Sequence, residues 1–148
     1  MGLQEQMDWH PFLVHFPLVL LPVSVGLDLS AWLGRRPSRH GLAYVILVLG
    51  TLSALAALLT GTAAADAHLT GPVGSHIVRH ENLATIVSLL FLVVTIGRLP
   101  LQLRGRLEDW AIRMWIAVAA VGCGLLWLTG YYGGRLVYHY GVGVQILD

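Results

Sequence analysis

Long apolar runs separated by short polar stretches dominate the chain. A helix needs ~20 mostly apolar residues to cross a hydrocarbon core of ~30 Å. Four runs meet this requirement; they lie between Asp8 and Asp28 and at 41–65, about 80–97 and 114–134. With their flanking turns, we expect helices over about 9–33, 41–66, 76–100 and 109–134, followed by a Gly-rich C-terminal tail. The pattern predicts an all-α integral membrane protein whose residues 1–148 form a single transmembrane domain.

The connections and the arginines predict a topology. Short connections favour antiparallel neighbours, hence a four-helix up-down-up-down bundle. Two arginines, Arg79 and Arg135, lie on one side of the predicted bundle. The other seven lie on the opposite side: Arg35, Arg36, Arg39, Arg98, Arg104, Arg106 and Arg113. The positive-inside rule makes the arginine-rich side cytoplasmic, so both termini are expected outside, on the periplasmic or extracellular face of a bacterial inner (cytoplasmic) membrane.

The composition supports a lipid-facing surface and excludes some functions. Hydrophobic residues make up 56% of the chain and charged residues 11%, whereas soluble domains carry roughly 25% charged residues. The net charge of +1, without a basic tail, gives no reason to expect a nucleic-acid partner. Met1–Asp8 is mildly acidic, so we expect the first run to be a permanent helix rather than a cleaved signal. The single cysteine, Cys123, predicts packing rather than covalent haem attachment.

Histidines gather on the predicted outer side. Six of the seven are expected there, and His40 is interpreted as a loop residue on the inner side. His15 and His80 fall at similar depths on two helices that run inward from the same face. Two imidazoles that meet at one depth could serve as the axial ligands of a haem iron. Arg79 and Arg135 could then pair with its propionates.

Other interpretations of the histidines stay open. A buried histidine is often only hydrogen-bonded to a carbonyl of a neighbouring helix. His10 is interpreted as interfacial, and His139 as the substitute ligand if His15 or His80 fails. His76 and His80 are spaced i, i+4 and could instead hold a small metal ion. Three residues could complete that alternative site: His68, Asp66 and Glu81.

Two further features have competing interpretations. Small residues at alternating spacings of four and three share one face of the second predicted helix: Gly50, Ala54, Ala57, Gly61 and Ala64. Such a face allows close helix packing and also leaves room for a flat cofactor. Asp28 and Asp66 lie near the ends of predicted spans, where solvated carboxylates are expected. Arg98, followed by Pro100, is interpreted as a helix terminus rather than a site.

Several motifs resemble a known family over essentially the whole chain. The residues 10–17, His-Pro-Phe-Leu-Val-His-Phe-Pro, resemble the opening signature of small bacterial membrane proteins grouped as domain of unknown function 2231. The segment 61–66, His80 with Asn82, and the segments 133–138 and 141–144 fit the same pattern. The resemblance implies a partner of respiratory chains and suggests His10, His15 and His80 as haem ligands. The family often has histidine immediately before its Gly-Val-Gly-Val segment; here that position is Tyr140, and His139 precedes it.

These observations favour a small subunit that binds haem b and transfers electrons. It would link a quinone pool to an extracytoplasmic redox partner, within a larger membrane complex rather than as a stand-alone enzyme. Two alternatives come from other classes of protein. One is a histidine-based module for metal binding or transport, and the other is an accessory membrane subunit without a cofactor.

Overall fold

The computed structural model describes residues 9–36, 38–65, 73–106 and 110–144. Within these ranges the regular structure is entirely helical, which confirms the all-α part of the predicted fold. The helices are α1 (His10–Leu13), α2 (His15–Leu33), α3 (Ser38–Ala65), α4 (Gly74–Leu103) and α5 (Trp110–Tyr138). Four helical stretches in the described chain are long and apolar enough to cross a membrane, α1 and α2 together forming the first. They contain 24, 28, 30 and 29 residues, more than the ~20 that a bilayer requires.

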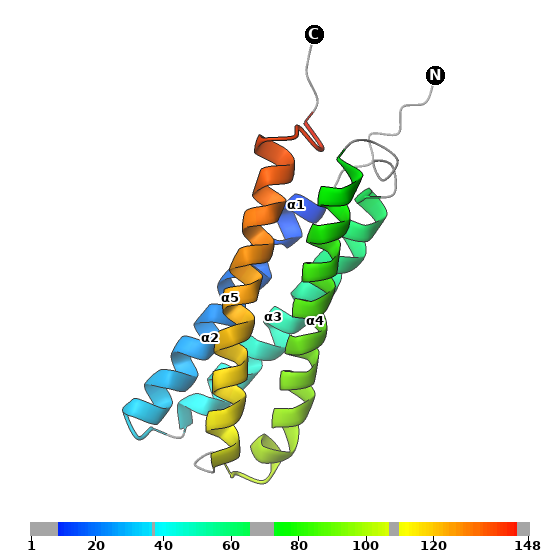
Figure 1. The fold of residues 1–148 in the computed structure, drawn as a ribbon. Coiled ribbons are helices and arrows are strands. Elements are labelled where there is room, and N and C mark those ends of the chain that lie inside the picture. Colours follow the sequence, from blue (N-terminus) through cyan, green and yellow to red (C-terminus); the bar gives the residue numbers. More distant parts are fainter. Residues whose placement is uncertain (1–8, 37, 66–72, 107–109, 145–148) are drawn as a thin grey trace.

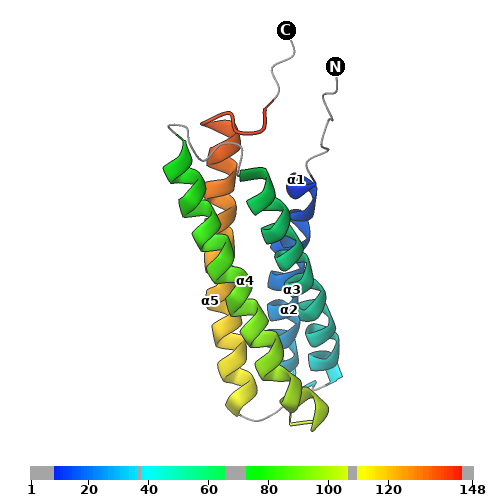
Figure 2. The same cartoon turned by 90° about the vertical axis from the view of Figure 1, so that its right-hand side faces the viewer.

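The long helices lie side by side in one bundle, and each runs opposite to its predecessor (Figure 1, Figure 2). α1, the end of α3, the start of α4 and the end of α5 meet at one end, here called the His10 end. The end of α2, the start of α3, the end of α4 and the start of α5 meet at the opposite end, here called the Arg98 end. Helices adjacent in sequence pack as hairpins, α2 against α3 and α4 against α5.

Apolar residues line the interior and also cover the outside of the bundle. Leu21, Leu47, Phe91 and Val94 are fully buried at its centre. Large aliphatic and aromatic side chains are exposed along the outer faces of all four spans. Such an outer surface would be unfavourable in water but is suited to lipid.

The first span is interrupted at Val14, which separates α1 from α2. Pro17 has no backbone N–H, so it cannot form the helical hydrogen bond to the carbonyl of Leu13. The prediction of one helix over 9–33 is therefore refined into a four-residue helix followed by a 19-residue one. The interruption matters for function because His10 lies before it and His15 after it.

The fourth span continues beyond the predicted end at 134, and its helix ends at Tyr138. Gly133 and Gly134 therefore do not terminate α5. The chain turns instead at Gly141, whose φ of +69° suits glycine. After this turn, the N–H of Val142 donates a hydrogen bond to the carbonyl oxygen of Leu136, with an N···O distance of 2.9 Å.

Close packing between α4 and α5 depends on Gly97, against which the Trp115 ring lies. A Cβ at position 97 would overlap that ring, whereas a Cβ at Gly124 on α5 would meet no atom within 4 Å. We expect Gly97→Ala to destabilise the bundle by about 1–3 kcal/mol, the usual range for overpacking. Thermal unfolding of the detergent-solubilised protein checks this. Gly124→Ala is the matched control, and equal melting temperatures for the two variants would contradict the packing argument.

Candidate functional site

His10 is fixed at the start of α1 by a contact with α3. Its side chain is half-buried, and its Nδ1 lies 2.8 Å from the carbonyl oxygen of Ala57. Gly61, one turn further along α3, faces the same ring. A Cβ at position 61 would lie only 2.7 Å from Cε1 of His10. The small-residue face of α3 thus provides both an acceptor for this imidazole and the space beside it.

His80, in the second turn of α4, has the same kind of support from α5. Its Nδ1 lies 3.1 Å from the carbonyl oxygen of Thr129. Gly133, again one turn further along the supporting helix, faces the ring. A Cβ at position 133 would lie 3.0 Å from Cε1 of His80. Each hairpin of the bundle therefore contributes one histidine, one carbonyl and, four residues after that carbonyl, one glycine.

The two imidazoles face each other across the His10 end. Their ring centroids are 6.4 Å apart and their planes are inclined at 80°. Because a carbonyl oxygen only accepts hydrogen bonds, each Nδ1 must carry a proton and donate it. The lone pair suited to a metal is then on Nε2, and the Nδ1–H···O=C bond is the usual support for a metal-binding histidine.

The distance between the ring centroids is compatible with two imidazoles that would hold one metal ion between them. With metal–nitrogen bonds of about 2.0–2.1 Å and a ring centroid ~1.1 Å behind each nitrogen, two such imidazoles have centroids roughly 6.3 Å apart. The observed 6.4 Å agrees with this value.

His15 does not take the position predicted for it. It is exposed, and its Nδ1 lies 3.4 Å from the carbonyl oxygen of Phe12, three residues earlier in the chain. His10, which was interpreted as interfacial from its position and suggested as a ligand by the family resemblance, lies beside His80 instead. The depth of His15 was a poor guide because a helix rotates by ~100° per residue, so residues five apart point in different directions.

The other described histidines and arginines at the His10 end contact tyrosines. The ring of His76 stacks on that of Tyr140, with the ring centroids 4.5 Å apart, and His76 Nε2 lies 3.1 Å from the tyrosine hydroxyl oxygen. His139 is exposed and meets the edge of the same tyrosine. Arg135 also lies over Tyr140, with Nη2 3.4 Å from the hydroxyl oxygen. None of these contacts brings His139 or Arg135 to the His10–His80 pair.

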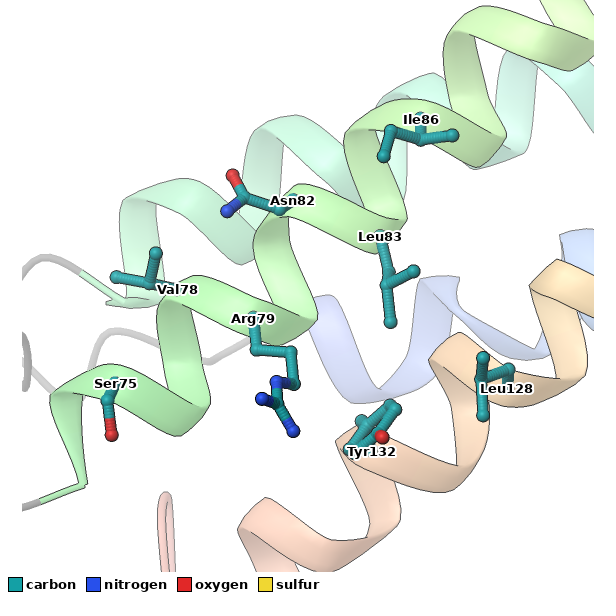
Figure 3. Close-up of a pocket in the computed structure, with 8 residues that line it drawn as sticks. All are labelled: Ser75, Val78, Arg79, Asn82, Leu83, Ile86, Leu128 and Tyr132. Atoms are coloured by element: carbon teal, nitrogen blue, oxygen red, sulfur yellow. The ribbon is translucent and has the colours of Figure 1, made fainter.

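Arg79 points into a groove between α4 and α5, over the ring of Tyr132 (Figure 3). His80 follows it directly in sequence but does not line this groove. The interpretation of Arg79 as a partner for haem propionates therefore gains no contact from the structure.

The alternative metal site built on His76 and His80 is not assembled among the described residues. His76 is turned toward Tyr140, and His80 toward Thr129 and His10. No group of three or more His, Cys, Asp or Glu side chains in the described part of the chain is placed to hold a metal ion. His68 and Asp66, which could complete this site, lie outside the described residues.

A second polar cluster, missed from the sequence, is buried at the Arg98 end. Asp28 on α2 accepts hydrogen bonds from His40 on α3 and from Arg98 on α4. Its Oδ1 lies 2.7 Å from His40 Nδ1 and 2.9 Å from Arg98 Nη2. Each of the three residues is at most 3% exposed. The interpretations of His40 as a loop residue, Asp28 as a solvated carboxylate and Arg98 as a helix terminus are therefore wrong.

The cluster links three helices and continues along α3 and α4. The guanidinium of Arg98 lies over the ring of Tyr44, and the Tyr44 hydroxyl donates to the carbonyl of Thr95. The Thr95 hydroxyl is 2.9 Å from that of Thr51. In the sequence, the available signal was the placement of one acid and one arginine at the same end of antiparallel apolar runs.

The comparisons with known proteins agree with the resemblance found in the motifs. The family described as "Predicted membrane protein (DUF2231)" matches residues 7–146. No curated protein and no solved structure matches the chain. The matched range contains all five described helices and both polar sites. Because the match spans nearly all of its 148 residues, the chain belongs to the DUF2231 family of predicted membrane proteins.

Proposed function

We propose that this protein is a membrane electron-transfer subunit that holds b-type haem between His10 and His80. The observation that carries the proposal is the facing pair of imidazoles, each supported at Nδ1 by a carbonyl of its hairpin partner. This donor set suits haem better than a bare zinc or copper ion. The porphyrin supplies four nitrogens, so two protein ligands are enough, whereas zinc sites usually need three or four protein ligands.

In this proposal the residues of the bundle bind, orient and shield the cofactor. The carbonyls of Ala57 and Thr129 would hold each ring in the tautomer that leaves a lone pair on Nε2 for the metal. Gly61 and Gly133 leave the space in which the rings lie. The bound iron would supply reversible one-electron chemistry, while the protein contributes ligation, orientation and a surrounding of low polarity.

The proposed orientation follows from the arginines. Seven of the nine lie at or next to the Arg98 end, which the positive-inside rule assigns to the cytoplasm. The histidine pair would then lie near the outer face of a bacterial inner membrane. From there the subunit could pass electrons between quinone in the bilayer and an extracytoplasmic redox partner.

The visible spectrum of the purified protein tests the proposal. The full chain, produced with an adequate haem supply, should show a Soret band and resolved α and β bands in its reduced-minus-oxidised spectrum. His10→Ala and His80→Ala should each lower the haem content at least tenfold, because each removes one of two axial ligands. His15→Ala is the matched control, since His15 lies in the same span and is exposed.

The same preparation distinguishes the alternatives. A colourless protein with stoichiometric zinc or copper would favour a metal module. A colourless, metal-free protein would favour an accessory subunit in which both histidines only join helices. Loss of haem in His15→Ala with retention in His10→Ala would reject the assignment of the pair while keeping the cofactor.

A further inference from the structure

A lateral groove between α4 and α5 extends from Ser75, near the start of α4, to Ile86 and Leu128 (Figure 3). Its volume is about 440 Å³, within the usual range for sites of small molecules. Arg79 and Leu83 point from α4 toward Tyr132 and Leu128 of α5. The lining residues Val78, Ile86 and Leu128 are exposed on the outside of the hairpin, where lipid is expected.

The chemistry of the groove changes along its length. Ser75 and Arg79 are one helical turn apart near the start of α4, where a membrane interface is expected. Leu83, Ile86 and Leu128 line the deeper part, and Asn82 lies between the two parts. From Ser75 to Ile86 the helix advances ~16 Å at about 1.5 Å per residue. The groove thus combines a polar, cationic end with an apolar trough at hydrocarbon depth.

Arg79 carries a charge that no acidic side chain among the described residues neutralises. The ion pairs found in that part of the chain belong to Asp28, and the contact of Arg79 is the ring of Tyr132, 5.9 Å from its guanidinium carbon. Seven of the nine arginines lie at or next to the Arg98 end, and Arg79 is one of the two that do not. A guanidinium at an interface binds phosphate oxygens well, through two parallel hydrogen bonds.

We propose that this groove is a binding site for an anionic phospholipid. The headgroup phosphate would lie at Arg79, within reach of the Ser75 hydroxyl, and one acyl chain would lie against Leu83, Ile86 and Leu128. A bilayer lipid is the occupant that matches both ends of the groove, because a soluble anion would leave the apolar trough unfilled. The proposal does not depend on haem, since His80 does not line the groove.

Native mass spectrometry of the detergent-solubilised full chain tests the proposal with two lipids of equal acyl length. Phosphatidylglycerol should bind at one site about fivefold more tightly than phosphatidylcholine, as expected for one interfacial arginine. Arg79→Gln should remove this preference, and Arg79→Lys should retain most of it. Arg135→Gln is the matched control, because it removes the same charge at the same end but lies against Tyr140.

A second variant tests the apolar part while leaving the charge in place. Leu128→Trp fills the trough and should weaken phosphatidylglycerol binding at least fivefold. Glycerol phosphate, which has the charge without acyl chains, should compete poorly with the lipid. An unchanged lipid preference in Arg79→Gln, or unchanged binding in Leu128→Trp, would overturn the proposal; melting curves establish that each variant is folded.

Discussion

Replacing Asp28 by leucine should lower the free energy of unfolding by about 3–5 kcal/mol, the usual effect of removing one partner of a buried ion pair. The carboxylate accepts hydrogen bonds from both His40 and Arg98. Without it, the Arg98 guanidinium, which is 1% exposed, would remain in the apolar interior with no counter-charge. The midpoint of denaturation in mixed detergent micelles, followed by circular dichroism, measures the loss. Asp28→Asn should have a smaller effect, because its amide oxygen can still accept one hydrogen bond.

A second substitution separates the ion pair from simple packing. Arg98→Leu alone should also destabilise, because Asp28 keeps only His40 as its partner. The double variant Asp28→Leu, Arg98→Leu should recover much of the loss, since apolar replacements of a buried pair are often neutral. Arg113→Leu, at an exposed position near the same end, is the control. Additive losses in the double variant would show that the two residues act independently.

The four spans could be predicted from the sequence because length and hydropathy are local properties of a run. The direction in which each helix faces could not. In a soluble protein the apolar side of a helix faces the core, but here both the core and the lipid-facing side are apolar. Leu21 is fully buried and Val19 is largely exposed, although both are aliphatic residues of α2. Hydropathy therefore gives the depth of a residue in the membrane and not its rotation about the helix.

The histidine pair was predicted from depth alone, and the rotation of each helix decided which histidines meet. His15 and His80 have similar predicted depths, but only the packed bundle shows that His15 is exposed and His10 is turned inward. The glycines were visible in the sequence, yet their role depends on which ring lies against them. Gly61 was placed on a small-residue face, but nothing local to α3 links that face to His10.

The buried cluster at the Arg98 end illustrates the same limit. Asp28, His40 and Arg98 each lie near the end of an apolar run, where an isolated charged residue can reach water. Their mutual contacts depend on the relative heights and rotations of three helices. Those relations are set by packing, for example by Leu21 against Gly50 and by Trp115 against Gly97. A single sequence contains the residues that pack but does not show which of them meet.

The glycines beside the histidines give the most specific test of the proposed haem site. Gly61→Ala should lower haem affinity about 10–100-fold, the usual effect of disturbing the groups that orient a metal ligand. Its new Cβ would lie 2.7 Å from Cε1 and 3.0 Å from Nδ1 of His10, so the ring must move away from the Ala57 carbonyl. Gly133→Ala should have a smaller effect, because its Cβ would approach His80 only to 3.0 Å.

Gly134→Ala supplies the control for both changes. It lies next to Gly133 on α5, and a Cβ there would meet no atom within 4 Å. Haem titration of each purified variant, with the absorption spectrum and the melting temperature recorded together, should give the order of loss Gly61→Ala, then Gly133→Ala, with Gly134→Ala unchanged. Alanine favours a helix over glycine by about 1 kcal/mol, so any loss of haem should occur without loss of helical structure. Equal haem affinities in all three variants would mean that the imidazoles do not hold the cofactor in the positions described.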